Sequence, residues 1–146
     1  MSRGASLLEV LVALALIAIL AGLGVLDHQA LRPGLDLRMA ARQVVLDLRV
    51  ARMRAIAENV NRRVVFPSGA EGYQHQRKSG AVYVDDGVIV RLPRGILIRD
   101  CTATEHGIGF KPRGNAASFG TVTLRNRNGD EAQVVVDIAG QARVQG

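Results

Sequence analysis

The chain has 146 residues, with no tryptophan, five aromatic residues and a single cysteine. Because Cys101 has no second cysteine to pair with, an intrachain disulfide is excluded, and cysteine usage leaves the compartment open. Lysine is also scarce, with two lysines beside 17 arginines and a net charge of +6. Excess arginine suggests anionic partners such as phosphate or a membrane surface, but coding bias explains it as well. Nucleic acid is therefore a possible partner that the composition does not favour.

Sequence patterns for catalysis are also lacking. The chain has no Walker loop, no G-x-S-x-G elbow and no H-E-x-x-H metal spacing. Cys101 and His106 could form a nucleophile–base pair, but nothing in the sequence orients the histidine, and a buried thiol is the simpler interpretation. Asp85 and Asp86 precede Gly87 and fit a turn better than a cation site. The sequence predicts no enzyme activity, no catalytic or metal-binding residue and no cofactor.

Charge is absent from the run Val10–Leu26, which is rich in Leu, Ala, Ile and Val. At about 1.5 Å per residue, a helix of this length covers most of a hydrocarbon core, and the residues before it supply the rest. The sequence therefore predicts a transmembrane helix at about residues 7–26.

Three interpretations compete for this N-terminus. A secretory signal peptide would use Arg3 as its charged start and a small residue such as Ala21 near its cleavage site. An unprocessed single-pass anchor would keep Arg3 in the cytoplasm and send the C-terminal domain across the membrane. Neither of these two interpretations explains Gly4 or Glu9.

The third interpretation accounts for both, because Gly4-Ala5-Ser6-Leu7-Leu8-Glu9 resembles the type IV prepilin cleavage motif. The resemblance implies that a prepilin peptidase cleaves after Gly4 and that the new N-terminal residue, Ala5, is N-methylated. Members of that family usually carry Phe or Met where this chain has Ala5. The resemblance also implies a single-pass inner-membrane protein with a cytoplasmic N-terminus and a periplasmic C-terminal domain. After processing, such a protein is incorporated into a filament.

Glu9 is the one ionisable residue near the apolar run. A carboxylate deep in hydrocarbon costs on the order of a few kcal/mol, so Glu9 needs a partner. Ser6-x-x-Glu9 is also a capping box, and a carboxylate there suits the positive end of the helix dipole. The prepilin resemblance implies that the charged N-terminus of a neighbouring subunit neutralises Glu9 during assembly. We favour this assembly role, with which capping is compatible.

The helical pattern continues beyond the apolar run. Pro33-Gly34 predicts a kink or short break at residues 32–34. Apolar residues then recur at steps of three and four and predict an amphipathic helix that ends near Asn59: Leu37, Ala41, Val44, Leu48, Ala51 and Ala55. The other face carries Arg38, Arg42, Arg49, Arg52 and Arg54. A solvated surface, a phosphate site and contacts with acidic groups of adjacent subunits all fit this arginine row.

After Asn59 the pattern changes to short strands bounded by turn residues. The predicted strands are Arg63–Phe66, Tyr73–Arg77, Ala81–Val84, Val88–Leu92, Ile96–Arg99, Gly107–Phe110, Thr121–Arg125, Ala132–Ile138 and Gln141–Val144. Asp86-Gly87, Asn128-Gly129 and Ala139-Gly140 predict hairpin turns between neighbouring strands.

The predicted fold is α+β, with a long N-terminal helix packed on a small antiparallel β domain, as in pilins. The lower half of this helix is predicted to be membrane-embedded and the upper half amphipathic. The domain prediction is a leader at 1–4, a helix at 5–59 and an extracytoplasmic β-rich domain at 60–146.

The prepilin-like start, the arginine- and alanine-rich helix and the β-rich tail together resemble the GspH/FimT family of minor pilins and pseudopilins. The segments that carry this resemblance are Ala41–Ala57, Phe110-Lys-Pro-Arg-Gly114 and the terminal hairpin Val134–Val144. It implies a structural subunit that primes or caps a type II secretion pseudopilus or a type IV pilus by bundling N-terminal helices. The implied partners are the prepilin peptidase and other major and minor pilins or pseudopilins, with no small-molecule substrate.

An alternative function follows from the same family, since some FimT-type members bind DNA through a C-terminal G-R-x-R motif. This chain has Gly140-Gln141-Ala142-Arg143, so Arg143 is retained as a DNA-contacting candidate while Gln141 replaces the first arginine. Losing one phosphate contact lowers the salt dependence of binding by about one unit of slope. A pilus DNA receptor for natural transformation is thus the alternative function, and an unprocessed single-pass anchor is the second alternative.

Overall fold

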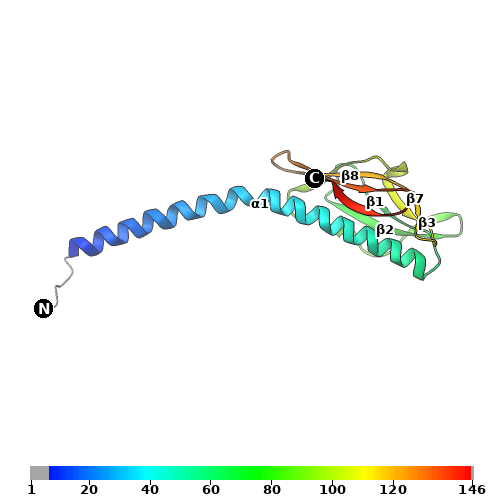
Figure 1. Cartoon of the computed structure of the whole chain (residues 1–146), viewed down its shortest axis with the longest axis horizontal. Helices are drawn as coiled ribbons and strands as arrows, with labels where there is room; N and C mark the ends of the chain where they lie inside the picture. The colour runs from blue at the N-terminus through cyan, green and yellow to red at the C-terminus, as the bar shows by residue number, and fades with distance from the viewer. Residues whose placement is uncertain (1–6, 146) are drawn as a thin grey trace. The chain divides into compact units, whose positions relative to one another are not determined.

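The computed structural model describes residues 7–145, and for residues 21–33 it describes the backbone alone. The chain divides into two compact units, Met1–Pro33 and Gly34–Gly146. One long α-helix, α1 (Leu7–Ala57), contributes to both units and is followed by ten short strands, with a 3-10 helix, η1 (Thr104–His106), between β5 and β6 (Figure 1). The strands are β1 (Arg62–Val65), β2 (Gly72–Ser79), β3 (Val82–Asp85), β4 (Val90–Arg91), β5 (Ile96–Cys101), β6 (Gly107–Phe110), β7 (Ala116–Ser118), β8 (Gly120–Asn126), β9 (Glu131–Val136) and β10 (Ala142–Gln145).

The helix differs from its prediction in two respects. Its helical conformation continues through residues 32–34, where a kink or short break was predicted, so the break is absent, and it ends at Ala57, two residues before the predicted end. Asn59 has a φ of 52°, a left-handed conformation that turns the chain out of the helix.

A transmembrane segment was predicted at about residues 7–26. Among the residues that the structure describes, no helix is long and apolar enough to span a membrane.

The strands form two antiparallel sheets in the second unit. One sheet has the order β3-β2-β1-β6-β7, with β4 also paired to β2, and the other has the order β10-β9-β8-β5. Buried apolar side chains stand at alternate positions of three strands, so that one side of each faces the core: Ile96 and Ile98 in β5, Val122 and Leu124 in β8, and Val134 and Val136 in β9. The predicted α+β architecture, a helix packed on antiparallel β-sheet, is confirmed.

Both sheets and α1 share one hydrophobic core. Val44 and Leu48 from the helix, Phe66 beside the first sheet and Ile98 and Leu124 from the second are all fully buried in it. Four alanines on the same face of the helix are also buried in this core: Ala40, Ala41, Ala51 and Ala55. Every residue of this core lies between Leu37 and Ala142. The unit Gly34–Gly146 therefore contains a complete core of its own.

Two of the three predicted hairpin turns are confirmed. Asn128-Gly129 joins β8 to β9, and Gly129 has the positive φ of 90° that such a turn requires. Gly140, with a φ of 78°, lies in the turn between β9 and β10.

The hairpin predicted at Asp86-Gly87 is wrong, because β3 and β4 do not pair with each other. Both strands pair with β2, which is eight residues long and offers separate parts of the same edge to each of them. The actual tight turn in this region lies between Ser79 and Val82, which are paired across β2 and β3. Strand β7 was not predicted at all, since Ala116–Ser118 carries little of the β-branched or aromatic signal of a strand.

Candidate functional site

The first part of α1 exposes an apolar surface that bears one carboxylate. The large apolar side chains of residues 7–20 are each 49–80% exposed. Glu9 lies in the first turn of the helix, where the positive end of the helix dipole favours a carboxylate. Ser6, its predicted capping partner, and the processing residues Gly4 and Ala5 lie outside the described residues.

From Gly34 onward, α1 has apolar side chains on two opposite faces. The inner face, which contains Val44 and Leu48, is buried against the sheets. Because successive residues of a helix are separated by about 100°, Leu46 lies about 160° around the axis from both of them. Leu46 is 58% exposed, and Met39 and Met53, seven residues before and after it, are equally open. The second apolar row therefore lies on the face that points away from the core.

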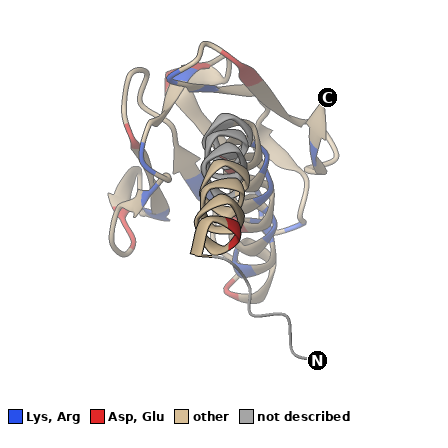
Figure 2. Cartoon of the chain, turned by 90° about the vertical axis from the view of Figure 1, so that its left-hand side faces the viewer, with Lys and Arg blue, Asp and Glu red and all other residues tan. Residues whose placement is uncertain are grey.

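The arginines of α1 carry charge that the domain does not neutralise. Figure 2 shows basic residues recurring along one edge of the helix. Among the residues described, none of Arg38, Arg42, Arg49, Arg52 and Arg54 lies within ion-pair distance of a carboxylate. Their positive charge is therefore available to an anionic group from outside the chain.

Arg52 and Arg49 have a structural task besides their charge, because both donate hydrogen bonds to backbone carbonyls. The Arg52 Nε donates to the carbonyl of Gly114 at 2.7 Å, and Arg49 donates to the carbonyl of Ala142 at 3.4 Å. With residues 140–142, these two arginines line a cavity of about 250 Å³. Arg49 thus ties α1 to the start of β10, and Arg52 ties it to the turn between β6 and β7.

Gly140 sits at the tightest point of this junction. A Cβ atom at position 140 would lie 2.5 Å from the carbonyl oxygen of Gly114, closer than real Cβ contacts allow. Gly140 N–H donates to the carbonyl of Asp137, and the Asp137 side chain accepts from Gln141 N–H. The hairpin of β9 and β10, which contains Arg143, is thus held beside the helix, while the Arg143 and Gln141 side chains are exposed.

An ion-pair cluster fastens the far end of α1. The nearly buried Arg62 forms short charge-assisted hydrogen bonds to Glu58, just after the helix, and to Asp86, just after β3. The hydrogen bond from Arg62 holds the pKa of the Asp86 carboxyl below its usual value. Asp86 was predicted only as a turn residue, so the sequence missed this cluster. One signal was present, since Glu58 and Arg62 stand four residues apart.

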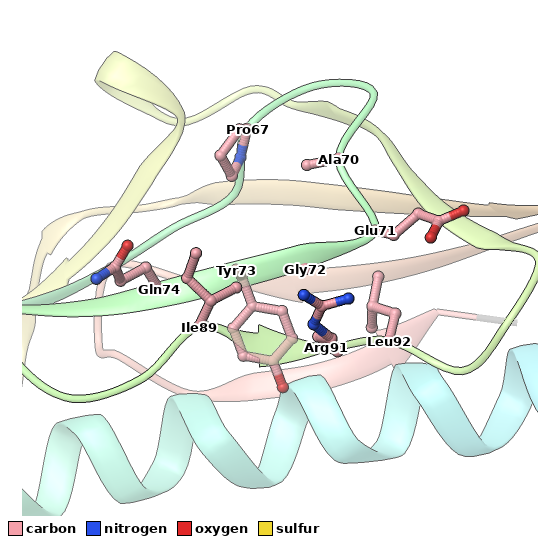
Figure 3. Close-up of a pocket in the computed structure, with 9 residues that line it drawn as sticks. All are labelled: Pro67, Ala70, Glu71, Gly72, Tyr73, Gln74, Ile89, Arg91 and Leu92. Atoms are coloured by element: carbon pink, nitrogen blue, oxygen red, sulfur yellow. The ribbon is translucent and has the colours of Figure 1, made fainter.

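Tyr73 connects the same helix to β2. Its hydroxyl donates a hydrogen bond to the Asp47 carboxylate, and its ring contacts Phe66 with 5.1 Å between centroids. Burial, and then the hydrogen bond to Asp47, raise the pKa of Tyr73. In Figure 3 the Tyr73 hydroxyl points from the strand toward the helix, below a pocket of about 300 Å³ that Ile89, Arg91 and Leu92 also line.

The nucleophile–base pair considered for Cys101 and His106 has no support in the geometry. Cys101 is buried, and burial raises the pKa of its thiol, whereas a reactive cysteine requires a lowered one. The His106 Nδ1 lies 3.1 Å from the backbone carbonyl of Cys101. Among the side chains that the structure describes, those of residues 7–20 and 34–145, no group of three His, Cys, Asp or Glu is placed to hold a metal ion.

The sequence model of a known protein family covers most of the domain just described. Residues 40–141 match the family described as Type II transport protein GspH. The chain belongs to this family. The matched region of this GspH-family chain contains Arg52, Gly114 and Gly140, whereas Glu9 and Arg143 lie outside it. No curated protein matches the sequence.

Solved structures share the fold of this GspH-family member. The minor pseudopilin EpsH from the Type 2 Secretion System of Vibrio cholerae has a TM-score of 0.63 at 11% identity, covering 76% of this chain and 97% of that one. The type IV minor pilin FimU of Pseudomonas aeruginosa has a TM-score of 0.59 at 13% identity, covering 75% and 88%. The predicted GspH/FimT resemblance is confirmed, and these two solved structures show that the fold of the chain is that of pilin-type proteins.

Proposed function

We propose that this chain is a structural subunit that primes or caps a type II secretion pseudopilus or a type IV pilus by bundling its N-terminal helix with those of other subunits. The observation that carries the proposal is the exposure of every large apolar side chain described between Leu7 and Leu20. Such a surface is far larger and more continuous than the scattered apolar residues of an ordinary protein surface.

The apolar surface needs an apolar environment both before and after assembly. Burial contributes about 25 cal/mol per Å² of apolar area, so helices that present such surfaces associate strongly or insert into lipid. We propose the inner membrane as the first environment, with the N-terminus in the cytoplasm and the β domain in the periplasm. The uncharged run of the sequence continues beyond Leu20 to Leu26, which supports this placement. The bundle of neighbouring helices is the second environment.

Glu9 gives the bundle its register in this proposal. Prepilin peptidase cleaves after Gly4, and Ala5 becomes the methylated, positively charged N-terminus. The N-terminus of one subunit then pairs with Glu9 of its neighbour, which removes the cost of a lone carboxylate among apolar side chains. The first-turn position of Glu9 supports this role, because a carboxylate there is also tolerated in the free helix.

The test is to express Glu9→Ala and Glu9→Gln variants in the native host and purify the other pilins or pseudopilins. Both variants are expected to be cleaved after Gly4, as mass spectrometry of the mature N-terminus would show, but to be depleted about tenfold or more from purified filaments. Normal incorporation of both variants would refute the pairing role of Glu9. A wild-type chain that keeps Met1 or Ser2 would instead support the unprocessed anchor.

DNA binding remains a second candidate because the exposed Arg143 lies in β10, next to Ala142, whose carbonyl accepts a hydrogen bond from Arg49. A mobility-shift titration of the domain Gly34–Gly146 with duplex DNA tests it. Binding that weakens with salt, and that weakens further in Arg143→Ala, would support this candidate. If the DNA migrates equally with and without the protein at every salt concentration, DNA binding is excluded.

A further inference from the structure

Strand β10 has one edge that no described strand covers, because it lies at the end of its sheet and pairs with β9 alone. The Gln141 carbonyl, just before β10, accepts a hydrogen bond from Asp137 N–H and so faces the β9 side. The next carbonyl, that of Ala142, accepts from Arg49 of α1 and so faces the open edge. Backbone groups of successive strand residues point in opposite directions. The N–H and carbonyl of Val144 therefore point to the open edge as well.

A groove of about 850 Å³ lies between this open edge and α1, and we name it the edge groove. Leu37, Arg38 and Arg42 line it from the helix, and Val144 and Gln145 line it from β10. The strand thus begins beside residue 49 of the helix and continues past residues 42 and 38. A strand added to the open edge would therefore lie along α1.

Arg38 and Arg42 give the edge groove a positive wall. Steps of four and seven residues place Arg38, Arg42 and Arg49 within about 40° of one another around the helix axis. Arg49 uses this position to donate to β10, whereas neither Arg38 nor Arg42 forms an ion pair with a described carboxylate.

Two acids also line the edge groove, but both are engaged elsewhere. Asp130 accepts a hydrogen bond from Asn126, and Glu131 pairs with Arg99. The positive charge of the helix wall is therefore left for carboxylates that come from outside the chain.

The spacing of the two arginines matches the repeat of a β-strand. Residues four apart on a helix are separated by about 6 Å along its axis. Residues two apart in a strand lie on the same face and are separated by about 6.6–6.8 Å. Acidic side chains at alternate positions of an added strand would each meet one of Arg38 and Arg42 and form charge-assisted hydrogen bonds.

We propose that the edge groove binds an extended segment of another protein, which adds a strand to β10 and carries two Asp or Glu residues separated by one residue. Main-chain hydrogen bonds at Val144 supply affinity, and the two acids fix the register of the segment on Arg38 and Arg42. This inference concerns the unit Gly34–Gly146 alone and does not depend on the proposed role of residues 7–20 in assembly.

A second copy of this chain lacks the required acidic pattern. Its 13 Asp and Glu residues include the adjacent pairs Asp85-Asp86 and Asp130-Glu131, but no two of them stand two residues apart. Lipid phosphates and duplex DNA would neutralise the arginines, but neither offers the alternating N–H and carbonyl groups of a strand to Val144. An extended acidic segment matches both walls of the edge groove.

The first experiment selects binders from a phage library of random seven-residue peptides on the immobilised unit Gly34–Gly146, whose core is complete. At least half of the enriched sequences are expected to carry two acids separated by one residue. Enrichment of sequences without this spacing, or no enrichment over a blank surface, refutes the proposal.

The second experiment measures the best selected peptide by fluorescence anisotropy. Its control is an isomer in which one acid is moved by one residue, so that composition and charge are unchanged but the acids fall on opposite faces of the strand. The isomer is expected to bind at least about tenfold more weakly. Equal affinities would show that charge alone attracts the peptide and would overturn the proposal.

Charge variants locate the binding site. Arg38→Glu and Arg42→Glu are each expected to weaken binding about tenfold. Arg54→Glu makes the same charge change at an exposed position of the same helix outside the edge groove, and it should leave the affinity unchanged. Circular dichroism checks that all three variants fold. Equal losses in all three would contradict the assignment to the edge groove.

Amide hydrogen exchange tests whether a strand is added. The bound peptide is expected to slow exchange of the Val144 amide about tenfold, whereas the Arg143 amide, which faces β9, should exchange at its original rate. A peptide that binds without protecting Val144 refutes strand addition. Binding of phosphatidylglycerol vesicles or duplex DNA that Arg42→Glu abolishes, in the absence of any selected acidic peptide, also refutes the proposal.

Discussion

Replacing Gly140 with Ala is expected to destabilise the domain by more than the cost of placing a residue with a Cβ in a left-handed conformation. Position 140 has a φ of +78°, and its added Cβ would lie 2.5 Å from the Gly114 carbonyl oxygen. Because that oxygen belongs to the backbone, no side-chain rotation relieves the contact. The turn must move away from Gly114, and the carbonyl that accepts the Arg52 hydrogen bond shifts with it.

The magnitude follows from two contributions. A left-handed conformation costs a residue with a Cβ about 1 kcal/mol. Displacement of well-packed backbone by an added methyl group costs about 2 kcal/mol more. Gly140→Ala should therefore lower the free energy of unfolding by about 3 kcal/mol, or the melting temperature by about 12 °C at about 4 °C per kcal/mol.

Gly129→Ala is the matched control for this prediction. Gly129 also has a positive φ, of +90°, but its Cβ would meet only the end of the flexible Arg125 side chain, at 3.6 Å. This variant should lose about 1 kcal/mol, from the backbone conformation alone. Urea and thermal denaturation of the domain Gly34–Gly146, followed by circular dichroism, compare the two. Equal losses would show that the contact with Gly114 does not constrain the turn, and would refute the reasoning.

Two further substitutions test the contacts that hold α1 on the sheets. Asp86→Asn should lower the free energy of unfolding by about 2 kcal/mol at pH 7, because it leaves the nearly buried Arg62 with one ion-pair partner. Since Arg62 lowers the pKa of Asp86 in the folded state, this contribution is complete above about pH 4 and is lost as the pH falls through the folded value. Denaturation across that range should show the gap between the two proteins closing, and a constant gap would contradict the assignment. Tyr73→Phe should cost about 1–2 kcal/mol through its lost bond to Asp47. Tyr83→Phe, which keeps the ring beneath the Arg63 guanidinium, should change stability by less than about 0.5 kcal/mol in the same assay.

Features that depend on a few adjacent residues were predictable from the sequence. Asn128-Gly129 forms its hairpin because the left-handed geometry of the turn is decided by those two residues. The inner face of α1 was predictable in the same way, since the buried Val44 and Leu48 stand at helical spacing. Neither the turn nor the inner helix face depends on which strands pair with each other.

Features that depend on distant segments were not predictable. Asp86-Gly87 has the residues of a hairpin turn, yet the length of β2 lets it pair with the strands on both sides of that turn. The Arg62 cluster joins three separate segments, so Asp86 could be recognised only once β3 was in place. The spacing of Met39, Leu46 and Met53 is visible in the sequence. Which of the two apolar rows the sheets would cover is decided by tertiary packing.

The bonds from Arg52 to Gly114 and from Arg49 to Ala142 have a consequence for the order in which the chain folds. They join residues that are 62 and 93 positions apart, and the second reaches the last strand of the chain. Contacts of such long range form late, because the intervening chain must be ordered before they contribute stability. The helix is synthesised first, yet its contacts are complete only when β10 has been synthesised and has paired with β9. Folding of the domain is therefore expected to finish only after β10 has been made, and removal of β10 should leave α1 without its final attachment.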